Sequence, residues 1–381
     1  MHLLYLCDAD GGGIAEYALR QVKALEAQGA QVTFLCRSSF DVQRVRASEI
    51  RAILPRQCAG TGSAPVRLLR RIRDARTVAA IALREAASGD FDGLLIACYG
   101  EYFSPFWAAS LQRAAQKGLR IGTIAHDPVR DFVLGPLWWH RWSVRKAYSF
   151  VSDVFVHDPT PVDFGGTQPA GSQVHVIPHG PFEVGAPRMG REAMRGRYGF
   201  TPHDRVFLSF GQIRDGKNLD RFLRVMRELP ENVKLLVAGS GGGGSQMPPE
   251  TYRQLAADLG VSDRCVFDFR YIPDEETGDL FAAADTVLMT YSAKFRSASG
   301  VLNTAVTCRK PVLASSGAGP LKTAVEEYQL GVFVPPDDDA AILEGARRLI
   351  TAPGQPDWDR YERENSWEEN AKRVMQAMAK N

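Results

Sequence analysis

Short apolar runs of strand length alternate along the whole chain with segments of helix length. In the first half, these runs are Leu3–Cys7, Gln31–Cys36, Gly93–Cys98, Arg120–Ala125, Asp153–His157 and Val174–Pro178. In the second half, they are Arg205–Phe210, Val233–Ala238, Cys265–Phe269, Thr286–Met289, Pro311–Ala314 and Gly331–Val334. Strands buried on both faces of a parallel sheet have continuous apolar sequences, and helices connect such strands. The pattern therefore predicts an α/β chain with two doubly wound, Rossmann-like domains.

The length of 381 residues also favours two domains. A stretch rich in proline and glycine, residues 178–187, separates the two halves and has no helical period. We therefore expect an N-terminal domain over residues 1–182 and a C-terminal domain over residues 183–360. The remaining segment, 361–381, is expected to form a helix that packs back on the N-terminal domain. Ser366 and Glu369 have the spacing of a capping box at the start of that helix.

Composition excludes several classes of protein. The chain has 46 basic and 44 acidic residues, so no global field attracts nucleic acid. No apolar stretch approaches the roughly 20 residues of a membrane span. The N-terminus has no basic leader, and we expect a cytoplasmic protein. The six cysteines form no CxxC pair, which argues against a zinc site or disulfide framework and favours reduced thiols.

A glycine-rich turn follows the first apolar run, with Gly11, Gly12 and Gly13 just before a helical pattern. Free amides at such a helix start suit a phosphate or a sugar hydroxyl. The alternative is a tight turn without a ligand. A dinucleotide site is less favoured, because the second apolar run ends at Arg37 with no carboxylate for a ribose. Asp8 and Asp10 resemble a metal-binding pair, but acids beside turns are common, and we expect no metal.

Three histidines follow apolar runs of the first half. His126 comes directly after one run and precedes Asp127, which could orient the imidazole. This position is typical of an active-site histidine. His157 repeats the pattern one run later, where a structural role is the favoured interpretation. His179 lies in the stretch between the domains and is expected to shape the turn.

The second half has a basic loop after its first apolar run. Arg214 and Lys217 lie three residues apart, after the turn at Gly211 and before a helix. Two cations beside a helix start form a site for a diphosphate. The alternative is a pair of solvated surface cations. Further on, Ser299 and Gly300 precede a predicted helix over Val301–Cys308 and allow a second phosphate to approach the backbone, although an ordinary serine cap is an equal alternative.

Together, these motifs resemble the retaining glycosyltransferases of family four, which have the GT-B fold. The matching segments are residues 11–17, 124–127, 177–180, 210–218, 269–273, 299–302 and 310–314. The resemblance implies two Rossmann-like domains that face a cleft. It further implies donor binding mainly by the second domain, acceptor binding by the first, and neither a metal nor a cofactor.

The resemblance also assigns roles to individual residues. His126, Arg214 and Lys217 would be catalytic, with His126 near the donor sugar and the two cations on the diphosphate. The donor-binding set would be Gly12, Gly13, Gly211, Arg270, Tyr271, Ile272, Arg296, Ser299, Gly300 and Thr304, with Arg270 to Ile272 beside the nucleobase. The chain departs from the family at two of these positions. Where the family commonly has a glutamate, seven residues and a second glutamate, this sequence has Arg296 and Thr304.

The function implied is transfer of a sugar from a nucleoside-diphosphate sugar to a glycan or lipid-linked acceptor. We expect a metal-independent, retaining enzyme of bacterial cell-surface polysaccharide synthesis. One alternative is a non-catalytic transferase-like subunit, favoured by the two absent glutamates. Another is a nucleotide-sugar epimerase, which would need a carboxylate base where Arg296 stands. An NAD-dependent oxidoreductase is least favoured.

One basic segment suggests a membrane partner. Residues 66–76 interleave arginines with apolar side chains, as interfacial helices do. Trp107 and the aromatic cluster Leu137–Trp142 belong to the same half. We expect this half to make peripheral contact with an anionic inner membrane face. The alternative is a normal amphipathic helix packed on the sheet.

Overall fold

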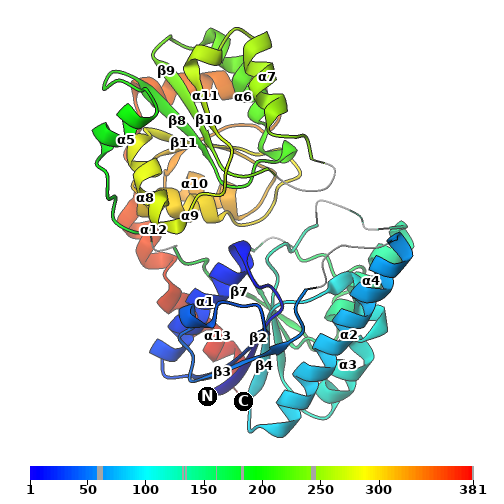
Figure 1. The fold of residues 1–381 in the computed structure, drawn as a ribbon. Coiled ribbons are helices and arrows are strands. Elements are labelled where there is room, and N and C mark those ends of the chain that lie inside the picture. Colours follow the sequence, from blue (N-terminus) through cyan, green and yellow to red (C-terminus); the bar gives the residue numbers. More distant parts are fainter. Residues whose placement is uncertain are drawn as a thin grey trace. The chain divides into compact units, whose positions relative to one another are not determined.

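The computed structural model describes residues 1–57, 63–130, 133, 135–159, 161–181, 184–241 and 246–379. The chain divides into two compact units (Figure 1). The N-terminal unit comprises Met1–His179 with Asn365–Asn381, and the C-terminal unit comprises Gly180–Glu364. The division lies between His179 and Gly180. The expected border between residues 182 and 183 lies outside the described residues.

The N-terminal unit is built on a parallel sheet in the order β3-β2-β1-β4-β5-β6-β7. Its strands are β1 (His2–Cys7), β2 (Gln31–Arg37), β3 (Glu49–Leu54), β4 (Gly93–Cys98), β5 (Ile121–Ile124), β6 (Asp153–Val156) and β7 (Gln173–Val176). Its α-helices are α1 (Gly12–Ala27), α2 (Ala64–Ser88), α3 (Ala108–Gln116), α4 (Leu137–Tyr148) and α13 (Trp367–Met378). The order reverses at β1, as in a Rossmann sheet.

The last helix returns to the N-terminal unit and packs against α1. Ser366 accepts a hydrogen bond from the Glu369 amide at 3.1 Å and so caps the helix. A buried polar network then joins the two helices. Asn370 accepts from Gln21 at 2.8 Å and donates to the Tyr17 hydroxyl at 2.9 Å. Each buried polar group of this network therefore has a partner, as burial demands.

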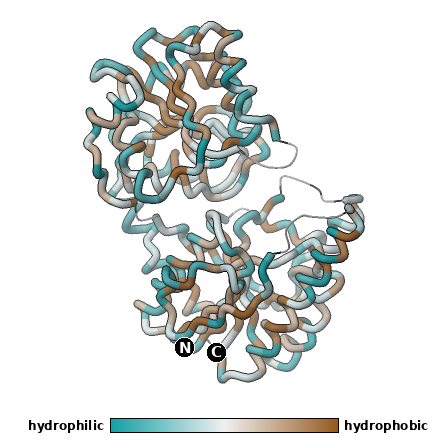
Figure 2. The backbone as a smooth tube through the Cα atoms, viewed as in Figure 1, coloured by the Kyte–Doolittle hydropathy of each residue, from teal (hydrophilic) through white to brown (hydrophobic). Residues whose placement is uncertain are grey.

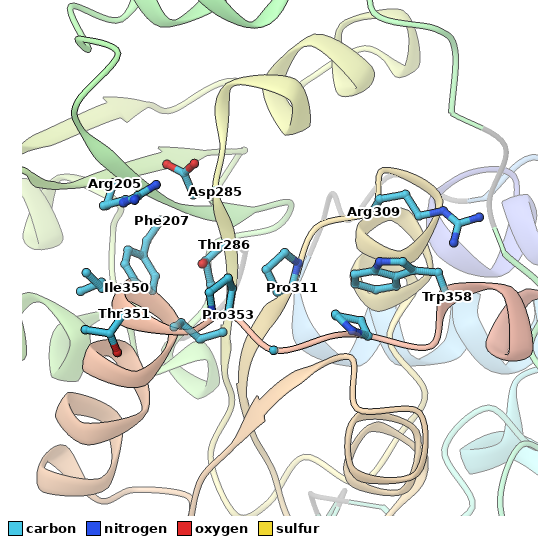
Figure 3. Close-up of a pocket in the computed structure, with 13 residues that line it drawn as sticks. Arg205, Phe207, Asp285, Thr286, Arg309, Pro311, Ile350, Thr351, Pro353 and Trp358 are labelled. Atoms are coloured by element: carbon cyan, nitrogen blue, oxygen red, sulfur yellow. The ribbon is translucent and has the colours of Figure 1, made fainter.

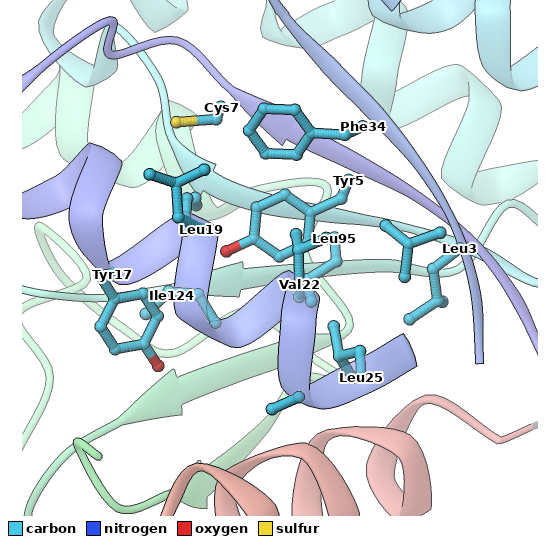
Figure 4. Packing of buried hydrophobic residues seen from close by; sticks show 14 of the residues in the cluster. Leu3, Tyr5, Cys7, Tyr17, Leu19, Val22, Leu25, Phe34, Leu95 and Ile124 are labelled. Atoms are coloured by element: carbon cyan, nitrogen blue, oxygen red, sulfur yellow. The ribbon is translucent and has the colours of Figure 1, made fainter. Parts of the chain in front are cut away.

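The core of the N-terminal unit lies between the sheet and its helices. Figure 4 shows Tyr5, Phe34 and Leu95 of three neighbouring strands beside Leu19 and Val22 of α1. These residues are buried. Burial of such apolar surface contributes roughly 25 cal/mol per Å² and holds α1, with the loop before it, against the sheet.

The C-terminal unit has a second parallel sheet, in the order β10-β9-β8-β11-β12-β13. Its strands are β8 (Arg205–Phe210), β9 (Val233–Ala238), β10 (Cys265–Asp268), β11 (Thr286–Thr290), β12 (Val312–Ser315) and β13 (Gly331–Phe333). Its α-helices are α5 (Arg191–Arg197), α6 (Leu219–Val225), α7 (Glu250–Asp258), α8 (Asp274–Ala283), α9 (Gly300–Thr307), α10 (Pro320–Glu327), α11 (Asp339–Thr351) and α12 (Trp358–Glu364). This sheet also reverses at its first strand.

Every predicted apolar run overlaps one of these strands, and Figure 2 shows the hydrophobic backbone segments inside each unit. The prediction of two Rossmann-like domains is therefore confirmed. The sequence analysis did not predict β3, an edge strand in which Leu54 alone is buried. In the part of the chain that the structure describes, no helix has the length and hydrophobicity needed to cross a bilayer.

Candidate functional site

Ligands of doubly wound sheets bind at the carboxyl ends of the strands, where the strand order reverses. The C-terminal unit reverses between β8 and β11. The loop after β8 carries Gly211, Arg214 and Lys217, and the loop after β11 leads to Ser299 and Gly300. The topology thus brings the two predicted phosphate-binding segments to one point of the sheet edge.

The loop after β8 has a fixed backbone. Gly211 has φ +81°, which favours glycine, and its amide donates to the Ala238 carbonyl at 2.9 Å. A Cβ atom added to Gly239 would lie 2.0 Å from the Gly211 oxygen, so the ends of β8 and β9 approach too closely for a side chain. Both glycines therefore have structural roles in placing the basic loop.

Lys217 is half-buried, and its ammonium donates a hydrogen bond to the Phe210 carbonyl at 2.5 Å. Burial of the ammonium, with repulsion from Arg214, lowers the pKa of Lys217 to about 7. The Arg214 guanidinium lies 6.0 Å from the centre of the Phe295 ring. Neither cation forms an ion pair with a carboxylate among the described residues. The arrangement concentrates uncompensated positive charge and is suited to an anion.

Direct contacts join the two loops. The Ser292 amide donates to the Gly216 carbonyl at 2.9 Å, and the Thr290 hydroxyl donates to the Lys217 carbonyl at 3.3 Å. A Cβ atom on Gly211 would lie 3.7 Å from the Lys217 ammonium and 3.9 Å from Val301 in the first turn of α9. The basic loop therefore lies beside the amino end of that helix, whose free amides carry partial positive charge.

The remaining predicted residues near α9 differ in exposure. Ser299 is buried, and its hydroxyl lies 3.4 Å from the Tyr291 hydroxyl rather than capping the helix. Arg296 is exposed, on a loop backed by Gly317 and Gly319. Thr304 is buried, and its hydroxyl donates to the Gly300 carbonyl of its own helix at 3.1 Å. Thr304 thus has an internal partner where the resemblance implies a ribose contact.

The segment after β10 carries the three residues predicted to border the nucleobase. Arg270 is engaged by Asp268 at 3.0 Å and by Glu276. The side chain of Tyr271 is 72% exposed, whereas Ile272 is 7% exposed and belongs to the hydrophobic core. Tyr271 is the most exposed of the three predicted nucleobase neighbours, and the contact of all three with a nucleobase stays a prediction.

In the N-terminal unit, the glycine-rich turn follows β1 and opens α1. Gly12 has φ +76°, so its conformation favours glycine. Gly11 and Gly13 lack positive φ, and a Cβ atom on either would meet nothing within 4 Å. The fold itself therefore gives no reason for glycine at these two positions. Close approach of a ligand to the backbone supplies one.

Three histidines at the ends of β5, β6 and β7 gather around one tyrosine of α1. The Tyr17 ring centre lies 4.7 Å from His126, 5.3 Å from His157 and 5.1 Å from His179. The Nε2 atoms of His126 and His157 are buried without a hydrogen-bond partner in the described structure. Burial lowers the pKa of His126 to about 4, so this imidazole is neutral at pH 7.

The sequence analysis did not predict that the three histidines lie together. The signal was present, because each histidine ends or directly follows one of three consecutive predicted strands, and the carboxyl ends of parallel strands lie at the same side of a sheet. No group of three histidine, cysteine, aspartate or glutamate side chains suited to a metal occurs within the described ranges.

Figure 3 shows a pocket of about 350 Å³ in the C-terminal unit. It is lined by residues at the starts of β8 and β11, among them Arg205, Asp285 and Thr286, and by Trp358. The basic loop follows the other end of β8. This pocket is therefore separate from the Arg214–Lys217 loop. The pocket lies at the amino ends of the strands, and the loop lies at their carboxyl ends.

Residues 190–374 match the family model described as glycosyl transferases group 1. The matched range covers most of the C-terminal unit and extends into α13. A D-inositol 3-phosphate glycosyltransferase from Acidothermus cellulolyticus is 29% identical over 215 residues, which span 54% of this chain and 46% of that relative. The chain therefore matches less than half of the relative's length. These matches are consistent with the predicted enzyme class, a glycosyltransferase.

Two solved structures extend the likeness to the whole fold. Anabaena Alr3699/HepE in complex with UDP and glucose has a TM-score of 0.72 and 17% identity, with 99% of each chain covered. WaaG, a glycosyltransferase involved in lipopolysaccharide biosynthesis, has a TM-score of 0.61 and 18% identity, covering 100% of this chain and 96% of its own. The expected GT-B architecture of two Rossmann-like domains is confirmed by this likeness.

Proposed function

We propose that the protein transfers a sugar from a nucleoside-diphosphate sugar to a glycan or lipid-linked acceptor. The observation that carries the proposal is the pair Arg214 and Lys217 beside the amino end of α9, neither of which pairs with a carboxylate of the described residues. A diphosphate is the anion that this group of charges and amides fits best. The UDP bound in the Alr3699/HepE structure is a ligand of this class.

In the proposed reaction, the bond between the sugar and the diphosphate breaks, and negative charge develops on the leaving group. Arg214, Lys217 and the backbone amides at Gly300 would stabilise that charge as it forms. Preorganised donors of this kind typically contribute roughly 2.7–4 kcal/mol each to lowering the barrier. We infer no metal in this step, and we propose that the anomeric configuration is retained, as the resemblance to family four implies.

A role in bacterial cell-surface polysaccharide synthesis is part of the proposal. It is supported by the fold likeness to WaaG, which is itself involved in lipopolysaccharide biosynthesis. We assign the acceptor to the N-terminal unit, and Gly12 and Gly13 of its glycine-rich turn stay predicted contacts of the donor. The catalytic role of His126 stays a prediction.

The test is a binding and turnover screen. The intact protein is mixed with UDP-, GDP- and dTDP-sugars, and thermal stabilisation and release of free nucleotide are measured. The proposal predicts stabilisation by one nucleotide class and release of UDP, GDP or dTDP when an acceptor is added. Stabilisation without release, with every acceptor, would favour a non-catalytic binding subunit. Arg296 and Thr304 at the usual glutamate positions are the observation that supports this second candidate.

We also propose peripheral contact with an anionic membrane at the cytoplasmic face. Helix α4 exposes Trp138 at 65% and Leu137 at 51%, and α2 exposes Leu69 at 66% among its arginines. Both helices contact the short helical segment Glu101–Phe106 between β4 and α3. Exposed tryptophan and leucine beside basic side chains are typical of interfacial surfaces.

Flotation with liposomes tests the membrane contact. Vesicles containing phosphatidylglycerol should carry the protein upward, and a Trp138→Ala, Leu69→Ala double variant should float about tenfold less. Equal flotation of the two proteins, or none of the wild type, would contradict this part of the proposal.

A further inference from the structure

The glycine-rich turn of the N-terminal unit has an anchored base and an open tip. At the base, the Cys7 thiol donates to the Ala9 carbonyl at 3.3 Å, and Asp10 accepts from the Ser39 hydroxyl at 2.7 Å. At the tip, a Cβ atom on Gly11 or Gly13 would meet nothing within 4 Å. The position of the tip therefore depends on how firmly the base is held.

The strongest anchor of the base is a buried arginine at the end of β2. Arg37 is 2% exposed, and its guanidinium contacts both the side chain and the backbone of the first residue of the turn. Nη2 lies 2.6 Å from the Asp8 carboxylate, and Nε donates to the Asp8 carbonyl at 2.8 Å. Two contacts to one residue fix its direction as well as its position.

The same guanidinium also reaches two elements outside the turn. Nη2 and Nη1 donate to the Asp74 carboxylate of α2 at 2.8 and 3.3 Å, which is a bidentate contact. Nη1 also donates to the Pro55 carbonyl after β3 at 2.6 Å. Each guanidinium nitrogen of Arg37 thus has a partner. The buried guanidinium connects β2 with the turn and with α2. Lysine could not make these contacts, because it lacks the planar fork.

We propose that Arg37 is a positioning residue for the ligand-binding glycine turn, and that Asp74 makes α2 part of the support of that turn. The expected effect on turnover rests on the proposed function. The expected effect on the position of the turn does not. Asp74 lies at the point where α2 begins to bury its inner face, from Ala75 onward. Neither Arg37 nor Asp74 needs to touch a substrate for this role, since they act through Asp8.

Asp74→Asn tests the proposal without removing the buried arginine. Helix α2 offers a matched control, because Glu85 pairs with Arg51 of β3 at 2.7 Å and does not contact the turn. In the intact protein, hydrogen exchange is measured at the amides of residues 9–13 for wild type, Asp74→Asn and Glu85→Gln. We expect exchange at these amides to rise about tenfold in Asp74→Asn and to be unchanged in Glu85→Gln.

Turnover provides the second readout. If the proposed transferase activity is present, kcat/KM should fall about tenfold in Asp74→Asn, recover in Asp74→Glu and stay at the wild-type value in Glu85→Gln. Equal exchange at residues 9–13 in both variants would overturn the positioning role. A selective rise in exchange with no transferase activity in any protein would leave the positioning role intact and would contradict the proposed function instead.

Discussion

The Lys217 ammonium donates a 2.5 Å hydrogen bond to the carbonyl oxygen of Phe210, the last residue of β8. The contact joins the two ends of the loop between Phe210 and Lys217. The ammonium is thereby held at the carboxyl end of the strand, where the strand order of the sheet reverses. A lysine in this position has little water to stabilise its positive charge. A bound anion would stabilise that charge instead.

The lowered pKa of Lys217, about 7, predicts a pH dependence of nucleotide binding. A bound diphosphate favours the charged ammonium, so binding takes up a proton when the free lysine is neutral. Affinity for UDP or GDP should therefore fall about tenfold per pH unit above pH 7. Calorimetric titrations between pH 7 and pH 9, where the phosphates stay fully ionised, measure the slope. The slope should vanish in Lys217→Met, and a flat wild-type profile would contradict the assignment.

Arg214→Ala should lower turnover about a hundredfold while the free energy of unfolding stays near the wild-type value. The arginine is exposed and has no carboxylate partner among the described residues, so its removal leaves no buried charge unpaired. Arg205→Ala is the matched control. This exposed arginine is the first residue of β8, and it lines the pocket at the amino end of that strand, away from the basic loop. Similar losses of turnover in the two variants would remove Arg214 from the site.

The glycine turn predicts a contrast between two neighbouring alanine substitutions. Gly12→Ala places a Cβ atom at φ +76° and should destabilise the protein by about 1 kcal/mol. Gly13→Ala meets nothing within 4 Å and lies in α1 without positive φ, so the protein should be as stable as the wild type or more stable by up to about 1 kcal/mol. It should nevertheless weaken ligand binding if the backbone is approached closely there. Urea unfolding and kcat/KM separate the two effects, and full activity in Gly13→Ala would argue for a turn without a ligand.

The neutral state of His126 predicts sensitivity to acid. Its folded pKa of about 4 lies below the usual value near 6.5, so the unfolded chain binds the extra proton first. Stability should fall as the pH drops from 6.5 towards 4, by up to about 3 kcal/mol from this group. His126→Gln should lose part of this dependence in urea unfolding at pH 7.5 and pH 5. The exposed His203 is the control, and equal pH dependence in both variants would contradict the buried, neutral assignment.

The sequence predicted the strands well because buried parallel strands have continuous apolar sequences. The one strand missed, β3, alternates glutamate and arginine with aliphatic residues at the edge of the sheet. An edge strand is partly solvated, so its sequence lacks the signal used for the others. The loops after β8 and β11 were also predictable, since topology alone places them together.

Side-chain contacts between segments that lie far apart in the chain could not be predicted from the sequence. Nothing near Arg37 indicates that its partners are Asp8 and Asp74, because these residues meet only after β2 and α2 have packed. The same holds for Thr304, whose hydroxyl bonds within its own helix, and for Ile272, which packs into the core. Motif spacing identifies candidates, but side-chain direction decides which of them face a ligand.

The central claim is that Arg214 and Lys217 bind the diphosphate of a nucleotide. Isothermal titration of UDP and GDP into the wild type and into an Arg214→Ala, Lys217→Met double variant at pH 7 tests it most directly. The account predicts that one of the nucleotides binds the wild type and that the double variant, with an unchanged unfolding midpoint, binds it at least a hundredfold more weakly. Equal affinity in the two proteins, or no binding of either nucleotide to the wild type, would contradict the claim.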